Sequence, residues 1–356
     1  MDASCLPCGI EIAEWSAGRA RGAIAARQRR PPAAPPTTDA PHPRPQEYFS
    51  PESVDFLERV CAASGLGDAT ALTPSIKKML FKDNTYHSTY DDCRDETYQV
   101  MFDTVGEVLR KTKIDPKEID ICITSCSCFA PMPSLTSVLV HKFSMRPDVQ
   151  TFALAGMGCG ASVPCVDMAR QLLATLPAGA KALIVNHENI TNNWYVGEDR
   201  SMLLCNALFR AGGAAIILSN SRAAGAKYRL VDVERTHMCG ADSAAVDAIS
   251  VECDNRGRRG VTLSKNLTRV AGAALRANLA GMASRQLPLT ELARVARAGK
   301  GAVPDLTKAF DKFLLHAGGP AVLYSAIETL GLQETHMSAS LDSLKHFGNT
   351  SSASTW

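Results

Sequence analysis

The residue best placed for covalent chemistry in this sequence is Cys159, which lies between Gly158 and Gly160. An apolar run at 151–155 precedes it and predicts a buried strand. A helical stripe follows, and Pro164 fits only in the first turn of that helix because proline donates no backbone hydrogen bond. Cys159 is therefore expected in the turn between strand and helix. Free N–H groups and the helix dipole would there lower the pKa of its thiol from ~8.5 to ~7 or below. A buried structural cysteine beside a tight turn is the alternative.

Two residues in the second half could assist such a thiol. His316 leaves an apolar run at 313–319 that predicts a strand, and Gly318 and Gly319 let a ligand or another backbone come close. Asn349 lies in a Gly-Asn-Thr-Ser turn, where its amide could orient a carbonyl or cap the next helix. Cys, His and Asn together indicate acyl transfer or hydrolysis, and a neutral His with an Asn amide suits a reaction that builds an enolate. Taken singly, a hydrogen-bonded core histidine and a helix cap remain the alternatives.

The elements that must position these residues alternate between strands and helices. Apolar or alternating runs predict strands at 119–125, 182–185, 212–218 and 228–234, and helical patterns are found from residue 51, at 94–113 and at 265–279. This alternation indicates α/β layers around a mainly parallel sheet. We divide the chain into a basic, proline-rich segment at 1–47 that is expected to be unstructured, a first half at 48–222 that carries the nucleophile, and a similar but incomplete second half at 223–356.

Composition excludes several classes of protein. The 356 residues are 46% hydrophobic and carry a net charge of +2, which does not indicate a nucleic-acid-binding protein. The twelve cysteines are scattered, so reduced thiols are expected rather than a disulfide framework. Cys5 with Cys8, and Cys122, Cys126 and Cys128, resemble metal-binding spacings only loosely, and no metal site is expected. No run approaches the ~18 apolar residues of a membrane span.

A series of motifs resembles the plant-type 3-ketoacyl-CoA synthases, the condensing enzymes of very-long-chain fatty acid elongation, which are similar to chalcone synthases. The resemblance runs from about Tyr48 to Trp356 in the order of the family. It implies the thiolase-like fold, with two α/β halves in five layers (α/β/α/β/α) and the second half incomplete. The motifs are Gly156-Met-Gly-Cys159-Gly, Glu188-Asn-Ile-Thr191, Asn193-Trp-Tyr195, Asp199-Arg-Ser-Met-Leu203, Leu208-Phe-Arg-Ala-Gly-Gly-Ala-Ala215, Arg235-Thr-His237, Leu263-Ser-Lys265, His316-Ala-Gly-Gly319 and Phe347-Gly-Asn-Thr-Ser-Ser352.

The resemblance also implies roles for individual residues. Cys159 would accept the acyl group from acyl-CoA, and His316 and Asn349 would hold the malonyl-CoA carbonyl as carbon dioxide leaves. The product would be a 3-oxoacyl-CoA two carbons longer, with no metal or redox cofactor needed. His237 would have a structural role. A homodimer paired through the strand at 151–155, a place at the endoplasmic reticulum membrane, and the elongase reductase and dehydratase as partners are also implied.

The sequence departs from the family in several places. No membrane-spanning segment is found, Lys312 stands where a second histidine is usual, His346 replaces an arginine, and His187 replaces a small residue before Glu188. The family continues beyond the position of Trp356, so this chain alone is expected not to condense substrates. A catalytically inactive chain that only binds a partner, and a thioesterase-like hydrolase, are therefore kept as alternatives.

Overall fold

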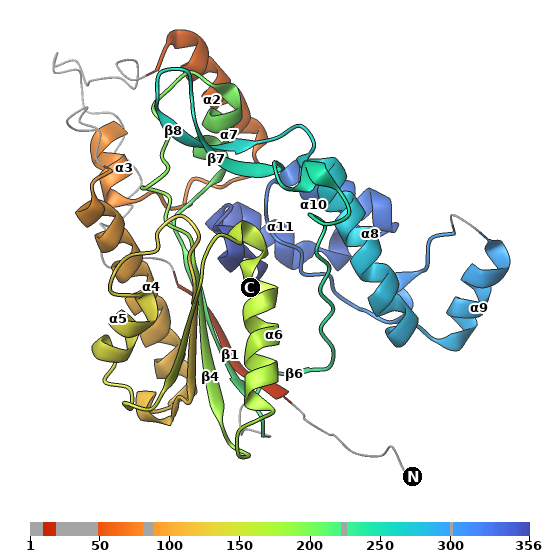
Figure 1. The fold of residues 1–356 in the computed structure, drawn as a ribbon. Helices are drawn as coiled ribbons and strands as arrows, with labels where there is room; N and C mark the ends of the chain where they lie inside the picture. The colour runs from red at the N-terminus through yellow and green to blue at the C-terminus, as the bar shows by residue number, and fades with distance from the viewer. Residues whose placement is uncertain (1–9, 19–48, 81–87, 222–225, 300–301) are drawn as a thin grey trace, which may run out of the picture.

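A six-stranded mixed sheet organises the first half of the molecule (Figure 1). The computed structural model describes residues 10–18, 49–80, 88–221, 226–299 and 302–356, with side chains from residue 49 onward. The strand order is β3-β2-β4-β5-β1-β6; β2 runs parallel to β3 and β4, and the other neighbours are antiparallel. The strands are β1 (Ile10–Gly18), β2 (Ile121–Ser125), β3 (Gln150–Leu154), β4 (Lys181–His187), β5 (Gly213–Ser219) and β6 (Tyr228–Leu230).

Helices cover both faces of this sheet. β2, β4 and β5 are buried along almost their whole length, as expected for strands with helices on both sides. One face packs on α4 and α5 through a cluster that includes Val108 and Leu183, and the other packs on α6 through one that includes Leu173 and Ile184. The result is an α/β/α arrangement (Figure 1). The covering helices are α4 (Tyr90–Thr112), α5 (Leu135–Lys142) and α6 (Ser162–Leu173).

Polar residues before the helices fix where they begin. Ser50 caps α2 (Pro51–Ala63), its hydroxyl accepting the Ser53 N–H at 3.2 Å. Thr89 and Asp92 form a reciprocal capping box, so α4 begins at Tyr90, a few residues before the predicted start. The predicted helices at 51 and at 94–113 are therefore confirmed.

The second half is mainly helical within the described ranges. Its own apolar cluster joins helices far apart in sequence and includes Leu323, Met337 and Leu344. The strands after β6 in the described ranges form one antiparallel hairpin, which lies near α7 in Figure 1. The elements are the hairpin strands β7 (Ile249–Cys253) and β8 (Arg259–Leu263), and the helices α7 (Arg200–Leu208), α8 (Leu267–Gln286), α9 (Leu289–Ala298), α10 (Pro320–Leu330) and α11 (Ser338–Phe347).

Several sequence predictions differ from the structure. The sheet, predicted to be mainly parallel, has two parallel and three antiparallel pairings, and β3, predicted to be a buried strand, is partly exposed because it lies at the edge. Residues 10–18, predicted to be unstructured, form β1 between β5 and β6; the rest of 1–47 lies outside the described residues. The strand predicted at 228–234 ends at Leu230. The strand predicted at 313–319 is absent: this segment has no strand partner within the described ranges, and its contacts include Phe313 N–H to His336 O at 2.9 Å and Leu315 N–H to Ser340 Oγ at 2.8 Å.

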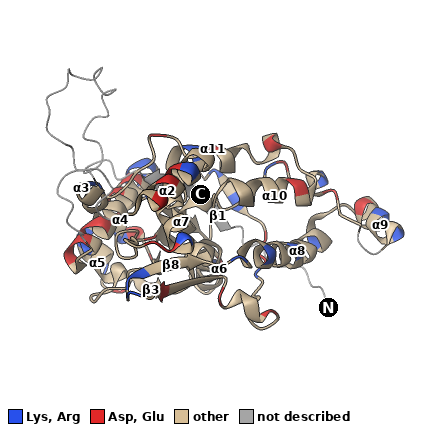
Figure 2. Cartoon of the chain, turned by 90° about the horizontal axis from the view of Figure 1, so that it is seen from above, with Lys and Arg blue, Asp and Glu red and all other residues tan. Residues whose placement is uncertain are grey.

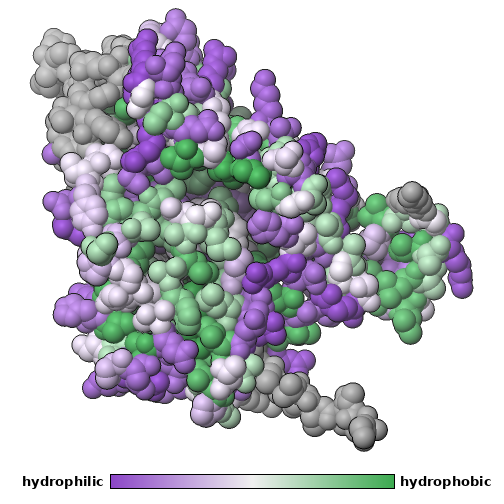
Figure 3. Space-filling view, viewed as in Figure 1, coloured by the Kyte–Doolittle hydropathy of each residue, from purple (hydrophilic) through white to green (hydrophobic). Residues whose placement is uncertain are grey.

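The surface carries mixed charge and some exposed apolar side chains. Both signs of charge occur on α2 and α9 (Figure 2). Apolar residues gather over the face that carries α6 (Figure 3). Exposed apolar side chains include Met132, Met157 and Val163, the last of which lies in the first turn of α6. Among the described helices, none has the length and apolar character needed to cross a bilayer.

Candidate active site

Cys159 lies in a short 3-10 turn, Gly158–Ala161, between β3 and α6. This confirms the strand-to-helix position predicted from the sequence. Gly158 has φ +54°, a conformation that favours glycine, and its N–H donates to Ser127 Oγ at 2.8 Å. Because β2, β3 and β4 are parallel, their carboxyl ends meet at this edge of the sheet, which is where open α/β sheets bind ligands. The nucleophile candidate is thus at the carboxyl edge and half-buried.

The segment from Asn349 to Thr355 is brought against this turn. Asn349 pairs with the segment after α7 as an isolated bridge, with Arg210 N–H to Asn349 O at 2.9 Å. Gly348 before it has φ +73°, and an added Cβ would lie 2.5 Å from Arg210 Cγ, so only glycine fits. The 3-10 helix Ser351–Thr355 then places Ser351 Oγ 3.4 Å from Cys159 Sγ. Residues almost two hundred positions apart therefore share one site.

His316 and Gly318 both contact the segment that begins at Asn349. His316 Nδ1 lies 2.6 Å from Ser354 Oγ. Asn349 Nδ2 donates to Gly318 O at 3.0 Å, and its Oδ1 accepts the Ser351 N–H at 2.9 Å; the N-cap of the following 3-10 helix is Thr350, so Asn349 is not its cap. An amide nitrogen carries two hydrogens, and within the described residues only one of those of Asn349 is bonded, so the other can donate to a substrate. The three candidate residues are thus gathered around residues 349–355.

Burial shifts the titration of the two central groups. It raises the pKa of the Cys159 thiol to about 11, with the Ser351 hydroxyl acting in the opposite direction and the Glu188 carboxylate adding to the rise. The predicted lowering of this pKa is therefore wrong, because loss of solvation outweighs the helix terminus. Burial lowers the pKa of His316 to about 4, so the imidazole is neutral at pH 7, as enolate stabilisation requires.

Sequence reasoning singled out neither Ser351 nor Glu188 as a site residue. Glu188 directly follows β4, is 6% exposed and has its pKa raised by burial. It borders a small cavity of about 40 Å³, lined by Cys128, Glu188, Asn193, Trp194, Phe209 and Val261 among others. A carboxylate three residues after the apolar run at 182–185 was the available signal. His237, which was expected to be structural, is exposed between β6 and β7.

Comparison with known proteins identifies the family. Residues 35–298 match the sequence family described as FAE1/Type III polyketide synthase-like protein. The chain belongs to this family. It is 40% identical over 320 residues to 3-ketoacyl-CoA synthase 11 and 40% identical over 319 residues to 3-ketoacyl-CoA synthase 5, both from Arabidopsis thaliana. These alignments cover 86% of this chain but 62% and 63% of the relatives, so the chain spans about three fifths of their length.

Solved structures show the same fold. The C-terminal type III polyketide synthase domain of Steely1, a type I/III hybrid from Dictyostelium, superposes with a TM-score of 0.68 at 17% identity, covering 98% of this chain and 88% of that domain. The thiolase-like α/β fold expected from the sequence is confirmed. At this level of identity, the likeness concerns the fold alone.

Proposed function

We propose that this protein is a 3-ketoacyl-CoA synthase, which condenses malonyl-CoA with a long-chain acyl-CoA in very-long-chain fatty acid elongation. Family membership and the two Arabidopsis relatives support the class of reaction. The observation that carries the assignment is the contact between Cys159 Sγ and Ser351 Oγ, because it brings the nucleophile turn to the Gly-Asn-Thr-Ser turn. Acyl transfer to a thiol followed by carbon–carbon bond formation needs both turns in one place.

The reaction divides into two steps. In the first, Cys159 attacks the acyl-CoA thioester, CoA leaves, and the acyl group is held as a thioester on Sγ. In the second, malonyl-CoA loses carbon dioxide while its thioester carbonyl accepts hydrogen bonds from neutral His316 and from the free N–H of Asn349. The enolate carbon attacks the acyl-cysteine, Cys159 is released, and the product is a 3-oxoacyl-CoA two carbons longer.

We also propose a homodimer paired through β3. This strand is at the edge of the sheet, and alternate residues such as Thr151 and Ala153 are exposed. An open edge strand is a ready partner for a second strand. The exposed side chains of Met157 and Val163 lie in the chain just beyond it and would add apolar surface. The same family context supports a place at the endoplasmic reticulum membrane with the elongase reductase and dehydratase.

Malonyl-CoA labelled in its free carboxyl group tests the function. The purified protein, given this substrate and a long-chain acyl-CoA, should release labelled carbon dioxide and form the lengthened 3-oxoacyl-CoA, followed by mass spectrometry. This result would contradict the expectation from the sequence that the chain alone does not condense substrates. The Cys159→Ala variant should lose both the acyl adduct and the lengthened product. Free fatty acid alone would instead indicate a hydrolase, and neither product would indicate a chain that only binds a partner.

A further inference from the structure

Arg210, the residue after the C-terminal cap of α7, is a partly buried cation that no carboxylate pairs with among the described residues. Burial lowers the pKa of its guanidinium. Arg258 and Arg294, by contrast, each pair with a carboxylate, at 2.9 Å and 2.6 Å. Removing a charge from water without an opposite charge is costly unless polar groups satisfy it. The chemistry described so far gives Arg210 no role that would account for this cost.

Backbone carbonyls at the end of α7 take the place of a carboxylate. Nη1 of Arg210 donates to the carbonyl oxygens of Asn206 at 3.3 Å, Ala207 at 3.0 Å and Phe209 at 2.8 Å. The last carbonyls of a helix lack partners within the helix and carry the negative end of its dipole. Nε of the same side chain donates to Thr70 Oγ1 at 3.1 Å. The guanidinium therefore fixes the end of α7 and ties it to the segment that follows α2.

The end of α7 in turn holds the backbone of Asn349. The two segments form a parallel bridge at Phe209 and Asn349. Arg210 N–H donates to Asn349 O at 2.9 Å, and Asn349 N–H donates to Leu208 O at 3.3 Å. Both backbone polar groups of Asn349 are thus bonded to the residues on either side of Phe209. A displacement of this stretch would therefore displace Asn349 as well.

The aliphatic part of the Arg210 side chain lies directly against Gly348. A Cβ added to Gly348 would lie 2.5 Å from Arg210 Cγ and 3.1 Å from Arg210 Cβ. Regions packed this closely transmit small displacements. On the other side of Arg210, Ala211 N–H donates to Ala71 O at 2.7 Å. Three segments that are far apart in the sequence therefore meet at this one side chain.

The donors of Arg210 are directed to the protein rather than to a substrate. They contact the carbonyls of α7 and Thr70, and the Cys61 thiol is the neighbouring titratable group. The Asn349 carboxamide, by contrast, donates one N–H to Gly318 O at 3.0 Å and has a second N–H for the substrate. A role for Arg210 in the reaction would therefore be indirect, through the position of this carboxamide.

We propose that Arg210 is a positioning residue that holds the Asn349 carboxamide where the malonyl-CoA enolate forms. The inference rests on the synthase function proposed above and concerns its second half-reaction. Without the guanidinium, three carbonyls lose their donor, the end of α7 relaxes, and the N–H of Asn349 moves. A misplacement of about 1 Å in a catalytic group costs about 10²-fold in rate. Lysine is an incomplete substitute, because its ammonium is a point charge without the planar fork of a guanidinium.

Variants at Arg210 test the proposal when both half-reactions are measured on the same preparation. The ratio of malonyl-CoA decarboxylation to acylation of Cys159 does not depend on the fraction of protein that is folded. Arg210→Met should lower kcat for decarboxylation by about 10-fold, with KM and acylation nearly unchanged. Arg210→Lys should lower it by about 3-fold. Arg200→Met, at the exposed start of the same helix, is the matched control and should keep both rates.

A double-mutant cycle separates positioning from general support of the fold. In the Asn349→Ala background, Arg210→Met should slow decarboxylation by less than about 2-fold, because no carboxamide is left to position. Chemical rescue gives a second measurement. Arg210→Ala lacks the atoms beyond Cβ, which N-ethylguanidinium replaces, so this cation should restore part of its decarboxylation rate. The same cation should leave Arg200→Ala unchanged.

The outcomes that overturn the proposal are distinct. Decarboxylation at the wild-type rate in Arg210→Met would overturn it and leave the synthase function intact. Equal slowing of the two half-reactions, or the same slowing with and without Asn349, would also overturn it, since Arg210 would then only stabilise the fold. If Arg210→Met yields no folded protein, Arg210→Lys decides by the same ratio. A wild-type protein that releases no carbon dioxide from malonyl-CoA would overturn the synthase function together with this inference.

Discussion

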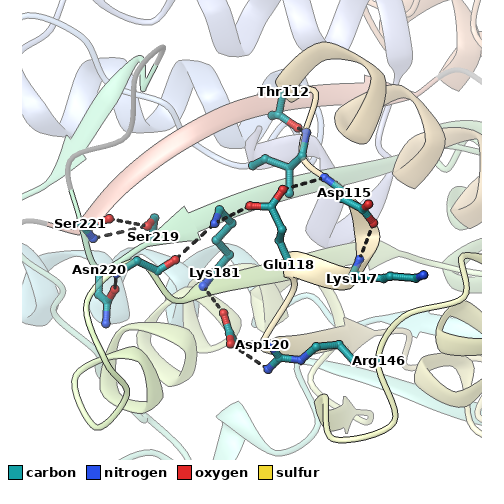
Figure 4. Close-up of polar contacts among 12 residues, drawn as sticks. Thr112, Asp115, Lys117, Glu118, Asp120, Arg146, Lys181, Ser219, Asn220 and Ser221 are labelled. Carbon is teal, nitrogen blue, oxygen red and sulfur yellow. Dashed lines mark hydrogen bonds and ion pairs between the residues drawn. The ribbon is translucent and has the colours of Figure 1, made fainter.

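At the amino ends of β2 and β4, ionised side chains are paired with one another and with the backbone (Figure 4). Asp120 accepts the Lys181 N–H at 2.7 Å and pairs with Arg146 at 2.8 Å. Lys181 Nζ lies 3.0 Å from Glu118, and this contact holds the pKa of the Glu118 carboxyl below its usual value. Asp120 and Glu118 thus each have an oppositely charged partner at this end, and for Glu118 the pairing favours the ionised form.

At the carboxyl ends of the same strands, titratable groups are buried without such partners. Glu188 and Cys159 have raised pKa values and His316 a lowered one, so burial favours the neutral form of each. His187 Nε2 and Asn186 Oδ1 are buried and have no hydrogen-bond partner within the described residues. An unpaired buried polar group costs about 1–3 kcal/mol.

The two ends of the sheet therefore have different properties. The amino end orients charges and stabilises the fold, whereas the carboxyl end gives up stability and keeps groups neutral beside the proposed nucleophile. Clusters of groups with displaced pKa values are typical of functional sites. Changes at the carboxyl end should therefore affect the reaction more than the stability, and changes at the amino end should do the reverse.

The largest effect is expected for Asn349→Ala at the carboxyl end. Loss of one donor to a developing enolate typically slows a reaction by about 10²–10³-fold. Decarboxylation of malonyl-CoA should fall by this amount, while acylation of Cys159, followed by intact mass, stays measurable. Loss of acylation with decarboxylation spared would show that the assigned role of Asn349 is wrong.

Acidification should weaken the fold through His187. Burial lowers its pKa from the ordinary 6.5 of a histidine to about 4. Between pH 6.5 and pH 4 the histidine binds a proton in the unfolded chain but not in the folded one. The contribution of His187 to the free energy of unfolding is therefore complete above pH 6.5 and is lost as the pH falls toward 4. The loss amounts to about 3 kcal/mol at pH 4. Glu96, with a pKa raised to about 7, acts oppositely: its contribution is present below pH 4.5 and is lost as the pH rises through 7.

Comparison with the His187→Asn variant separates the contribution of His187 from the opposing contribution of Glu96. Urea unfolding of the wild type and of His187→Asn, each at pH 7 and pH 4, gives four free energies of unfolding. The variant should lose about 3 kcal/mol less than the wild type on acidification, because the asparagine does not titrate. Equal losses in the two proteins would show that His187 does not govern the acid sensitivity.

Local sequence predicted the nucleophile turn but could not predict its electrostatics. The strand, turn and helix around Cys159 follow from patterns within about twenty residues, and the structure has them. The thiol pKa depends on Ser351 and Glu188, which only tertiary packing brings near. The strand expected at 313–319 failed for a related reason: alternation predicts an extended segment, but a strand also needs a partner, and Leu315 instead bonds to Ser340 on α11.

At the amino end, Asp120→Ala should reduce stability and leave the reaction alone. The Asp120 side chain is 21% exposed; its loss leaves the Lys181 N–H without its acceptor and removes one of the two carboxylates beside Arg146. The free energy of unfolding should fall by about 1–3 kcal/mol, with acylation of the folded protein unchanged. Asp148→Ala is the matched control: Asp148 also contacts Arg146, at 3.0 Å, but is 73% exposed, so about 0–1 kcal/mol is expected. Slowed acylation in Asp120→Ala would show that the two ends are coupled.

The smallest effect is expected for Gly318→Ala at the carboxyl end, which should displace the His316 side chain by a few tenths of an ångström. In Gly318→Ala the new Cβ would lie 3.1 Å from His316 Cδ2 and Nε2, which is tighter than ordinary van der Waals contact, so the imidazole must shift. A misplacement of about 1 Å in a catalytic group costs about 10²-fold, so a shift of this size should slow malonyl-CoA decarboxylation by roughly 2- to 5-fold. Gly240→Ala, where an added Cβ meets no atom within 4 Å, is the control and should react normally. Since His316 is placed in the second half-reaction, acylation of Cys159 should be equal in both variants. A decarboxylation rate in Gly318→Ala equal to that of Gly240→Ala would mean that the imidazole tolerates displacement, and that this end of the sheet is less exacting than its buried, unpaired groups indicate.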